Sequence, residues 1–196
     1  MNEALRIGMQ YAVAAPITSE VDGQAVVYGT GFVVGNAVAA TITWNRVDNS
    51  HYGDDVEDAR DNSITSGDIE FTNSGIAESV RAALLGDEKV GSTDEYEMGV
   101  EATPAVGFGY VRVIRKSGTL VYQGIWLHKV QFGENTINDN TKGENIEWGE
   151  TVLNGRIMAV KNNAQLKAHV MAHQEFATPA AAWAYLNGKA NISQSA

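Results

Sequence analysis

A long stretch of period-two alternation in the middle of the chain constrains the fold most. Residues 106–132 form two extended runs, separated by a Lys116-Ser117-Gly118 turn. The first run places large side chains on one side, at Phe108, Tyr110, Arg112 and Ile114. Alternation that is broken by a Ser-Gly turn is typical of a β-hairpin and not of a helix. This stretch therefore predicts a mainly-β fold organised around one long hairpin.

The composition fits one strand-rich globular domain over residues 1–196. Of these residues 44% are hydrophobic and 19% are charged, and the chain is long enough to bury a core. Leucine is scarce while Val, Ala, Gly and Thr are common, which favours strands. The absence of cysteine excludes disulfides, thiolate metal sites and cysteine nucleophiles. Because no apolar run approaches the roughly 18 residues that cross a bilayer and the N-terminus lacks a basic signal region, we expect cytoplasmic synthesis and no membrane partner.

The net charge of −10 is concentrated in two acidic segments. Residues 44–75 carry eight acids and two bases, and residues 134–150 carry five acids and one lysine, whereas residues 151–196 have a net charge of +3. A protein that wraps nucleic acid needs clustered Lys and Arg to displace counterions, so this balance argues against that function. The balance is compatible with a surface that DNA passes without sticking. Two solvated acidic loops are the simpler interpretation of composition alone.

Extended runs on both sides of the hairpin predict further strands, at 6–15, 25–28, 37–44, 66–72, 146–161 and 165–172. Three of these runs place apolar side chains on one face: Ile7, Met9, Tyr11 and Val13 in the first run, Val38, Ala40, Ile42 and Trp44 in the third, and Ile69 and Phe71 in the fourth. Residues 45–62 and 87–101 are polar and acidic, and we expect surface loops there. A loop as long as 45–62 without structure of its own is uncommon and is usually functional or ordered by a partner.

The clearest helix signal lies between residues 73 and 86. Asn73-Ser74 can cap it, Gly86 is a natural C-terminal stop, and one apolar stripe recurs at helical spacing at Ile76, Val80 and Leu84. A second, short helix over 180–186 is predicted by Thr178 as its cap and Pro179 at its first position. The polar residues 187–196 predict a frayed C-terminal tail.

Metal-binding patterns are weak in this chain. His169 and His173 have a spacing that could bind zinc on a helix, but the tetrad lacks the HExxH glutamate and lies in a strand-like run. Residues 138–149 faintly resemble a calcium loop, but Lys142 stands where an oxygen ligand is needed and Gly149 where glutamate is needed. The acids at 54–58 could bind a cation, but adjacent acids on a loop are more often simply solvated. We therefore expect no metal and no cofactor.

Catalytic patterns fare no better, and we expect no catalytic residue. The chain has no GxSxG and no SxxK motif, and nothing selects a carboxylate pair among its 24 acids. Gly107 and Gly109 lack the third glycine of a dinucleotide site, and we expect them to let a ring or backbone approach the strand. The four tryptophans could form a sugar-stacking surface, but such residues are more often core or interface anchors: Trp44, Trp126, Trp148 and Trp183.

The order and the residues of several motifs together are more informative about the family than any single motif. A Tyr52-Gly53-Asp54-Asp55 element is followed by a strand at 67–71 and by a helix that ends in Leu84-Leu85-Gly86. Next come the segment PAVGFGYVRV at 104–113, a strand at 126–132 and the segment TKGENIE at 141–147. In this order, from about residue 6 to residue 186, the chain resembles the major tail (tail tube) proteins of long-tailed, non-contractile bacteriophages. The motif positions in the hairpin and connector are Phe108, Tyr110, Trp126, Lys129, Phe132, Lys142, Gly143 and Glu144.

Two features depart from the family pattern. Gly53 stands where the family has alanine, which is a small-for-small change. We also expect no immunoglobulin-like C-terminal domain, which some tail tube proteins carry.

The resemblance implies a structural virion protein and not an enzyme. Such proteins form six-membered rings that stack into a tube, in which each subunit lends a sheet to a continuous β-barrel around the lumen. The implied fold is a β-sandwich or partial β-barrel with one flanking α-helix at 76–85, a long inter-ring loop at 45–62 and extended termini. The inter-ring contact would involve Tyr52, Gly53, Asp54, Asp55, Glu57 and Asp58.

The partners implied by the resemblance are identical copies, the tape-measure protein, and the tail terminator and distal tail proteins. DNA would pass through an acidic lumen that repels phosphates, without specific binding. The protein would be located in the phage tail after assembly in the host cytoplasm.

Other functions make different predictions. A secretion-system or pyocin tube protein would share most of these features. A stand-alone β-sandwich that binds a ligand such as a carbohydrate would be a stable monomer whose tryptophans are quenched by sugars. An enzyme would lose turnover when a pair of acids or histidines is replaced.

Overall fold

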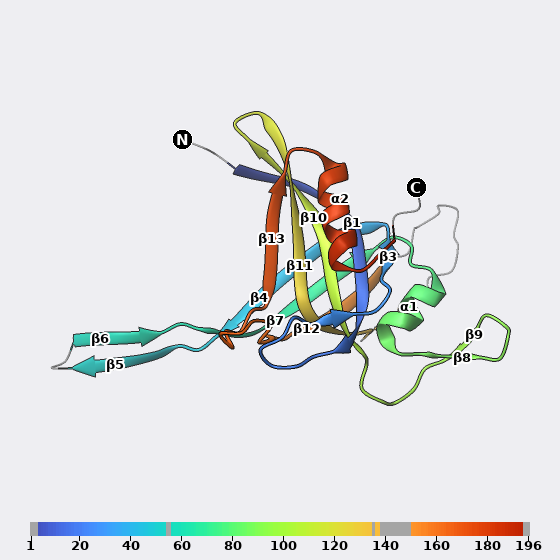
Figure 1. Cartoon of the computed structure of the whole chain (residues 1–196), viewed down its shortest axis with the longest axis horizontal. Helices are drawn as coiled ribbons and strands as arrows, with labels where there is room; N and C mark the ends of the chain where they lie inside the picture. Colours follow the sequence, from blue (N-terminus) through green and yellow to red (C-terminus); the bar gives the residue numbers. More distant parts are fainter. Residues whose placement is uncertain (1–3, 54–55, 135, 138–149, 194–196) are drawn as a thin grey trace.

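The fold is described by a computed structural model, in which residues 4–53, 56–134, 136–137 and 150–193 are placed (Figure 1). It is mainly β, as predicted, and most strands belong to one antiparallel sheet. The strands of this sheet are β1 (Ala4–Ser19), β2 (Val27–Tyr28), β3 (Phe32–Gly35), β4 (Ala37–Arg46), β7 (Ile64–Asn73), β10 (Ala105–Lys116), β11 (Thr119–Gly133), β12 (Thr151–Ile157) and β13 (Met171–Phe176). The remaining elements are β5 (Asn49–Gly53), β6 (Val56–Asp61), α1 (Glu78–Leu85), β8 (Glu88–Val90), β9 (Glu95–Glu97) and α2 (Pro179–Lys189).

The predicted central hairpin is confirmed as β10 and β11. The two strands pair from Ala105 opposite Gln131 to Lys116 opposite Thr119. Ser117 and Gly118 form the two-residue turn with φ of 47° and 86°. Positive φ at both central positions is the backbone that matches the twist of a tight hairpin, and glycine favours it.

Strand β11 is shared by two layers, because its partner changes along its length. Residues 122–127 pair with β13, whereas residues 130–133 pair with β12. The first layer is therefore β3-β1-β10-β11-β13, and the second is the end of β11 followed by β12, β7 and β4. The sheet folds over on itself into a sandwich-like arrangement, in agreement with the predicted fold class.

The main core lies between the two layers. Phe71 of β7 and Phe132 of β11 each contact Phe108 of β10, with both pairs of ring centroids 5.1 Å apart. Leu84 and Leu85 of α1 close one end of this core. The inward side of each contributing strand is apolar, which is the alternation that the sequence predicted for a half-buried sheet.

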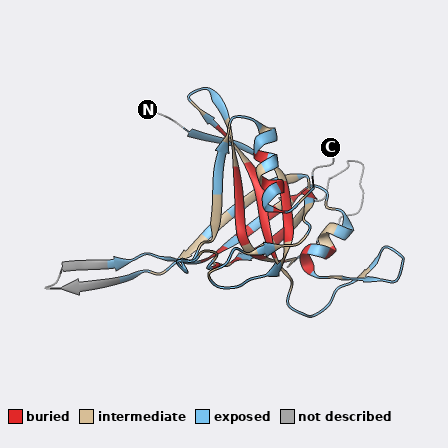
Figure 2. Cartoon of the chain, in the orientation of Figure 1, coloured by how far each residue is buried: buried red, intermediate tan, exposed pale blue. Residues whose placement is uncertain are grey.

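A second core lies on the other face of the first layer, beneath α2 (Figure 2). Trp126 of β11 is fully buried there with Leu186 of α2. Side chains added at Gly107 or Gly109 would clash with the Trp126 ring. The two glycines therefore let this ring lie against β10, as the sequence predicted.

Helix α2 begins as predicted and ends later. Thr178 accepts a hydrogen bond from the Ala181 amide at 3.3 Å, and Pro179 opens the helix. The predicted polar tail from residue 187 is wrong for its first residues, since the helix continues to Lys189. The Asn187 side chain accepts a hydrogen bond from the Tyr11 hydroxyl at 2.7 Å, and Ala190 is fully buried. Tertiary packing therefore extends the helix beyond residue 186, where the sequence predicts its end.

The single-face alternation predicted for β1 is wrong, because the strand contains an irregularity between Gln10 and Val13. Tyr11 has a φ of 53° there. Met9 and Ala12 pack on the main core, whereas Val13 packs on the second core. An extra residue in one strand exchanges the faces of all later residues, so both sides of β1 are buried after the bulge.

The same effect explains Val38 in β4. The register of β4 against β7 shifts between Ala37 and Ala39. Ala40, Ile42 and Trp44 pack on the main core as predicted, whereas Val38 is 45% exposed.

Helix α1 confirms the predicted stop and corrects the predicted start. Gly86 ends the helix in the left-handed region with φ 83°. The helix begins at Glu78, after Ala77, and no side chain caps it. Asn73 instead donates to the Val34 carbonyl oxygen at 3.2 Å and accepts from the Gly75 amide at 2.6 Å.

The apolar stripe of α1 is oriented as predicted. Leu84 is fully buried, whereas Val80 and Ile76, which precedes the helix, are half-buried against the same core.

Three segments predicted as loops or strands differ in the structure. Residues 45–62 contain the paired strands β5 and β6, and residues 87–101 contain the short β8–β9 hairpin. The predicted strand at 165–172 shifts to β13, preceded by a single bridge between Val160 and His169. Residues 45–62 and 87–101 are polar, so they lack the apolar alternation that reveals a strand in the sequence. In the described part of the chain, neither helix is long and apolar enough to span a membrane.

Candidate assembly surfaces

A two-stranded ribbon extends away from the sandwich (Figure 1). It consists of β5 and β6 and continues the hairpin formed by β4 and β7. The Val47 amide donates to the Ser63 carbonyl oxygen at 2.9 Å and joins the two parts. Residues 45–62, which we call the acidic ribbon, carry six acids and two arginines. The predicted long acidic loop is thus a protruding β-ribbon.

Most of the predicted contact residues of the loop lie in this ribbon. Tyr52 pairs with Glu57 and Gly53 with Val56, and Asp58 belongs to β6. Asp54 and Asp55 lie outside the described residues. At the base of the ribbon, Arg60 and Asp48 form an exposed ion pair at 2.8 Å. A pair in water of this kind adds at most about 1 kcal/mol to stability.

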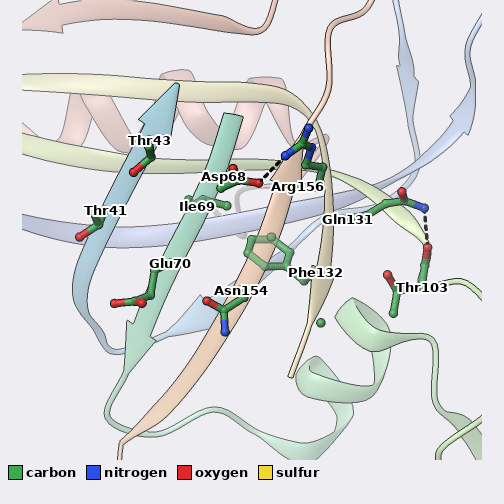
Figure 3. Close-up of a pocket in the computed structure, with 12 residues that line it drawn as sticks. Thr41, Thr43, Asp68, Ile69, Glu70, Thr103, Gln131, Phe132, Asn154 and Arg156 are labelled. Carbon is green, nitrogen blue, oxygen red and sulfur yellow. Dashed lines mark hydrogen bonds and ion pairs between the residues drawn. The ribbon is translucent and has the colours of Figure 1, made fainter. Parts of the chain in front are cut away.

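The outward side of the second layer is a polar face (Figure 3). It lines a hollow of about 540 Å³. Alternation places the apolar neighbours Ile69 and Phe132 in the core and turns the polar side chains outward. We define the polar face by Thr41, Thr43, Asp68, Glu70, Gln131, Asn154 and Arg156.

The charges of the polar face are partly paired. Arg156 donates to Asp68 at 2.8 Å, and Asn45 donates to the same carboxylate at 2.8 Å. The hydrogen bonds from Asn45 and Arg156 hold the pKa of Asp68 below its usual value. Glu70 has no ion pair within the described ranges. With two acids and one arginine, the polar face has a net charge of −1.

The main sheet is open at β4. Across the described strands, β4 (10 residues) is hydrogen-bonded to β7 on one side and to no strand on the other. A long unpaired edge is a template for pairing with another chain, and natural proteins cover or complete such edges. The edge of β4 is therefore a candidate contact surface.

The family-motif positions predicted in the hairpin serve the cores. Phe108, Tyr110 and Phe132 are buried in the main core and Trp126 in the second. Lys129 forms an ion pair with Glu20. Lys142, Gly143 and Glu144 lie outside the described residues.

The flanking helix adds a buried charge cluster at one end of the sandwich. Arg81 donates to Glu134 at 2.7 Å and to Asp87 at 3.1 Å, and both carboxylates are mostly buried. Hydrogen bonding and attraction by Glu134 raise the pKa of Arg81 in spite of the desolvation that opposes them. Arg81 is paired with both buried carboxylates and also with the exposed Glu78, so the cluster attaches α1 to the end of β11.

The tryptophans do not form one platform. Trp126 is buried, Trp44 is half-buried against the main core, and Trp183 lies 5.2 Å from Tyr11 between ring centroids. Trp148 lies outside the described residues. Phe132, whose ring is buried, is the one aromatic residue in the described lining of the hollow beside the polar face.

The histidines are also separate. His173 is exposed, and His169 is hydrogen-bonded to the side chains of Asn162 and Asn163. Across the residues that the structure places, no three metal-ligating side chains gather.

Sequence reasoning missed the polar face as a unit. The signal was present within each strand, because Asp68 and Glu70 flank Ile69, and Asn154 and Arg156 flank Gly155. What the sequence did not show was that these strands are neighbours in one layer.

No protein-family model matches the chain, and no curated protein matches it.

Proposed function

We propose that this chain is a structural subunit that assembles with identical copies into six-membered rings, which stack into the tail tube of a bacteriophage. The observation that supports this most is the open edge of β4 beside a protruding acidic ribbon. Among the described strands, none pairs with the free edge of β4, and the ribbon concentrates a net charge of −4 in residues 45–62. Identical neighbours around a ring would cover them at every position.

The polar face supports a lumenal role in such a tube. Its hydroxyl and amide side chains make it wettable, and its one arginine is paired with Asp68. A surface of net negative charge without an unpaired cation repels phosphates. We expect this face to line the lumen, so that DNA slides past it and does not bind.

The acidic ribbon supports contact between rings. It belongs to no layer of its own subunit, and β5 and β6 pair only with each other among the described strands. An arm with this geometry is suited to reach a neighbouring subunit. The tape-measure, tail terminator and distal tail proteins would be the further partners, and the protein would act in the virion.

Electron microscopy of the purified full chain tests the proposal. We expect concentrated protein to form tubes in negative stain and to sediment far above its 21.0 kDa subunit mass. A monomer that never polymerises at high concentration would refute the tube.

A deletion of residues 52–60 tests the role of the ribbon. No ribbon residue whose side chain the structure describes belongs to either core, so this variant should keep the circular dichroism spectrum and melting temperature of the wild type and lose stacking. A variant of full length in which Asp54, Asp55, Glu57 and Asp58 become Asn or Gln separates the effect of charge from that of length. Wild-type tubes from the deletion variant would show that the ribbon is not a stacking arm.

A further inference from the structure

A groove runs along β4, between this strand and strands β1 and β10 of the first layer. It consists of two adjoining hollows of about 550 and 290 Å³ that share Arg6, Ala40, Tyr110 and Arg112. These volumes are in the range of ligand-binding clefts. We call this the β4 groove; its further lining residues are Gly8, Met9, Val38, Ala39, Thr41, Ile42, Trp44 and Met171.

The groove exists because small residues face each other across it. Gly8 on β1 and Ala39 and Ala40 on β4 fill little space. Larger apolar side chains form the walls, among them Trp44 and Met171. Val38, which the register shift in β4 turns outward, adds an exposed apolar surface at one end.

Two arginines give the groove a positive charge in a protein of net charge −10. Arg112 donates to the Gln123 side chain and to the Tyr110 hydroxyl, each at 3.3 Å, and Arg6 is exposed. Within the described ranges, neither arginine has a carboxylate partner. Cations that lie over apolar walls without a counter-ion fit an acidic chain segment.

We propose that the β4 groove receives the acidic ribbon of a second copy of this chain, an inference that rests on the proposed assembly into rings and stacks. The ribbon has a net charge of −4 from six acids and two arginines, which complements the two arginines of the groove. It extends away from the sandwich of its own chain (Figure 1). The occupant is therefore the ribbon of a neighbour.

The groove and the ribbon are different surfaces, so the contact is heterologous. A heterologous contact generates either closed rings, or open helical arrays that keep one free groove and one free ribbon at their ends. A contact of this kind specifies an orientation between subunits as well as affinity.

Disulfide trapping tests the inference, because the chain has no cysteine of its own. Full-length Ala59→Cys, in the ribbon, is mixed with full-length Ala39→Cys, in the groove, and oxidised. The matched control replaces Ala39→Cys by Leu120→Cys, an exposed position outside the groove. We expect at least about tenfold more mixed disulfide with Ala39→Cys than with the control, identified by mass spectrometry of the linked peptides.

Charge reversal is the second arm. Arg6→Glu, alone and with Arg112→Glu, should reduce the mixed disulfide at least about tenfold. Arg115→Glu, on the same strand as Arg112, should not reduce it. The exposed Arg6 side chain has no hydrogen-bond or ion-pair partner among the described residues, so Arg6→Glu should retain the fold even where Arg112→Glu does not. Trapping that is unchanged by Arg6→Glu and the double variant would overturn the charge pairing.

The outcomes separate the two proposals. Wild-type tubes without a mixed disulfide would overturn the groove inference and leave the tail tube standing. A mixed disulfide without tubes would support the groove contact and overturn the tube.

Discussion

Replacing Gly109 with alanine is a sharp test of how α2 packs on the sheet. Gly109 lies on β10 directly opposite Trp126. An added Cβ would lie 2.7 Å from Trp126 Cε3, 2.8 Å from the Ile125 carbonyl oxygen and 2.9 Å from Leu186 Cδ2. Trp126 and Leu186 are fully buried, so neither side chain has room to move aside.

The expected loss of stability follows from two opposing effects. Overpacking a filled core costs about 1–3 kcal/mol. Alanine also restricts the unfolded chain, which returns about 0.4–1 kcal/mol. The middle of each range leaves a net fall of about 1.3 kcal/mol in the free energy of unfolding, which lowers the melting temperature by about 3–5 °C in a chain of this size.

The assay is thermal unfolding of the dissociated subunit, followed by circular dichroism. Gly8→Ala on the neighbouring strand is the matched control, since no atom lies within 4 Å of its added Cβ. The control should leave the melting temperature unchanged or raise it slightly. In a Trp126→Phe background, which removes the contacting ring atom, Gly109→Ala should cost less. A Gly109→Ala variant as stable as the wild type would refute the packing of α2 described above.

Three further predictions concern buried groups. Leu84→Asp places a charge in the main core and should cost roughly 3 kcal/mol or more; an unchanged melting temperature would mean that α1 does not pack there. Arg81→Met leaves the buried Asp87 and Glu134 carboxylates without their partner and should cost about 3–5 kcal/mol in urea unfolding, more than the exposed Arg60→Met. Burial, with minor repulsion from Lys189 and His169, lowers the pKa of His128 to about 4 from its ordinary value of 6.5. The unfolded chain thus binds a proton that the folded chain rejects, so stability should fall by up to about 3 kcal/mol as the pH drops from about 6.5 to about 4. His128→Gln should remove that part of the pH dependence, and an equal acid sensitivity in both proteins would contradict the assignment.

Local patterns in the sequence determined the elements that depend on neighbouring residues. The Ser117-Gly118 turn, the end of α1 at Gly86 and the start of α2 at Thr178-Pro179 were all predictable, because each depends on backbone preferences within a few positions. The alternation of β7 likewise predicted that Ile69 and Phe71 face the core.

Only the tertiary structure decided how these elements combine. The ion pair between Asp68 and Arg156 joins residues that are 88 positions apart in the chain. Asn187, which lies beyond the predicted end of α2, is hydrogen-bonded to Tyr11, 176 positions away. The bulge in β1 reverses which residues face which core, and no local pattern signals it. The polar face and the β4 groove likewise depend on strand order and register, which are fixed by packing between segments far apart in the chain. Period-two alternation shows that a strand has two faces, but the neighbours it acquires in the fold decide what each face contacts.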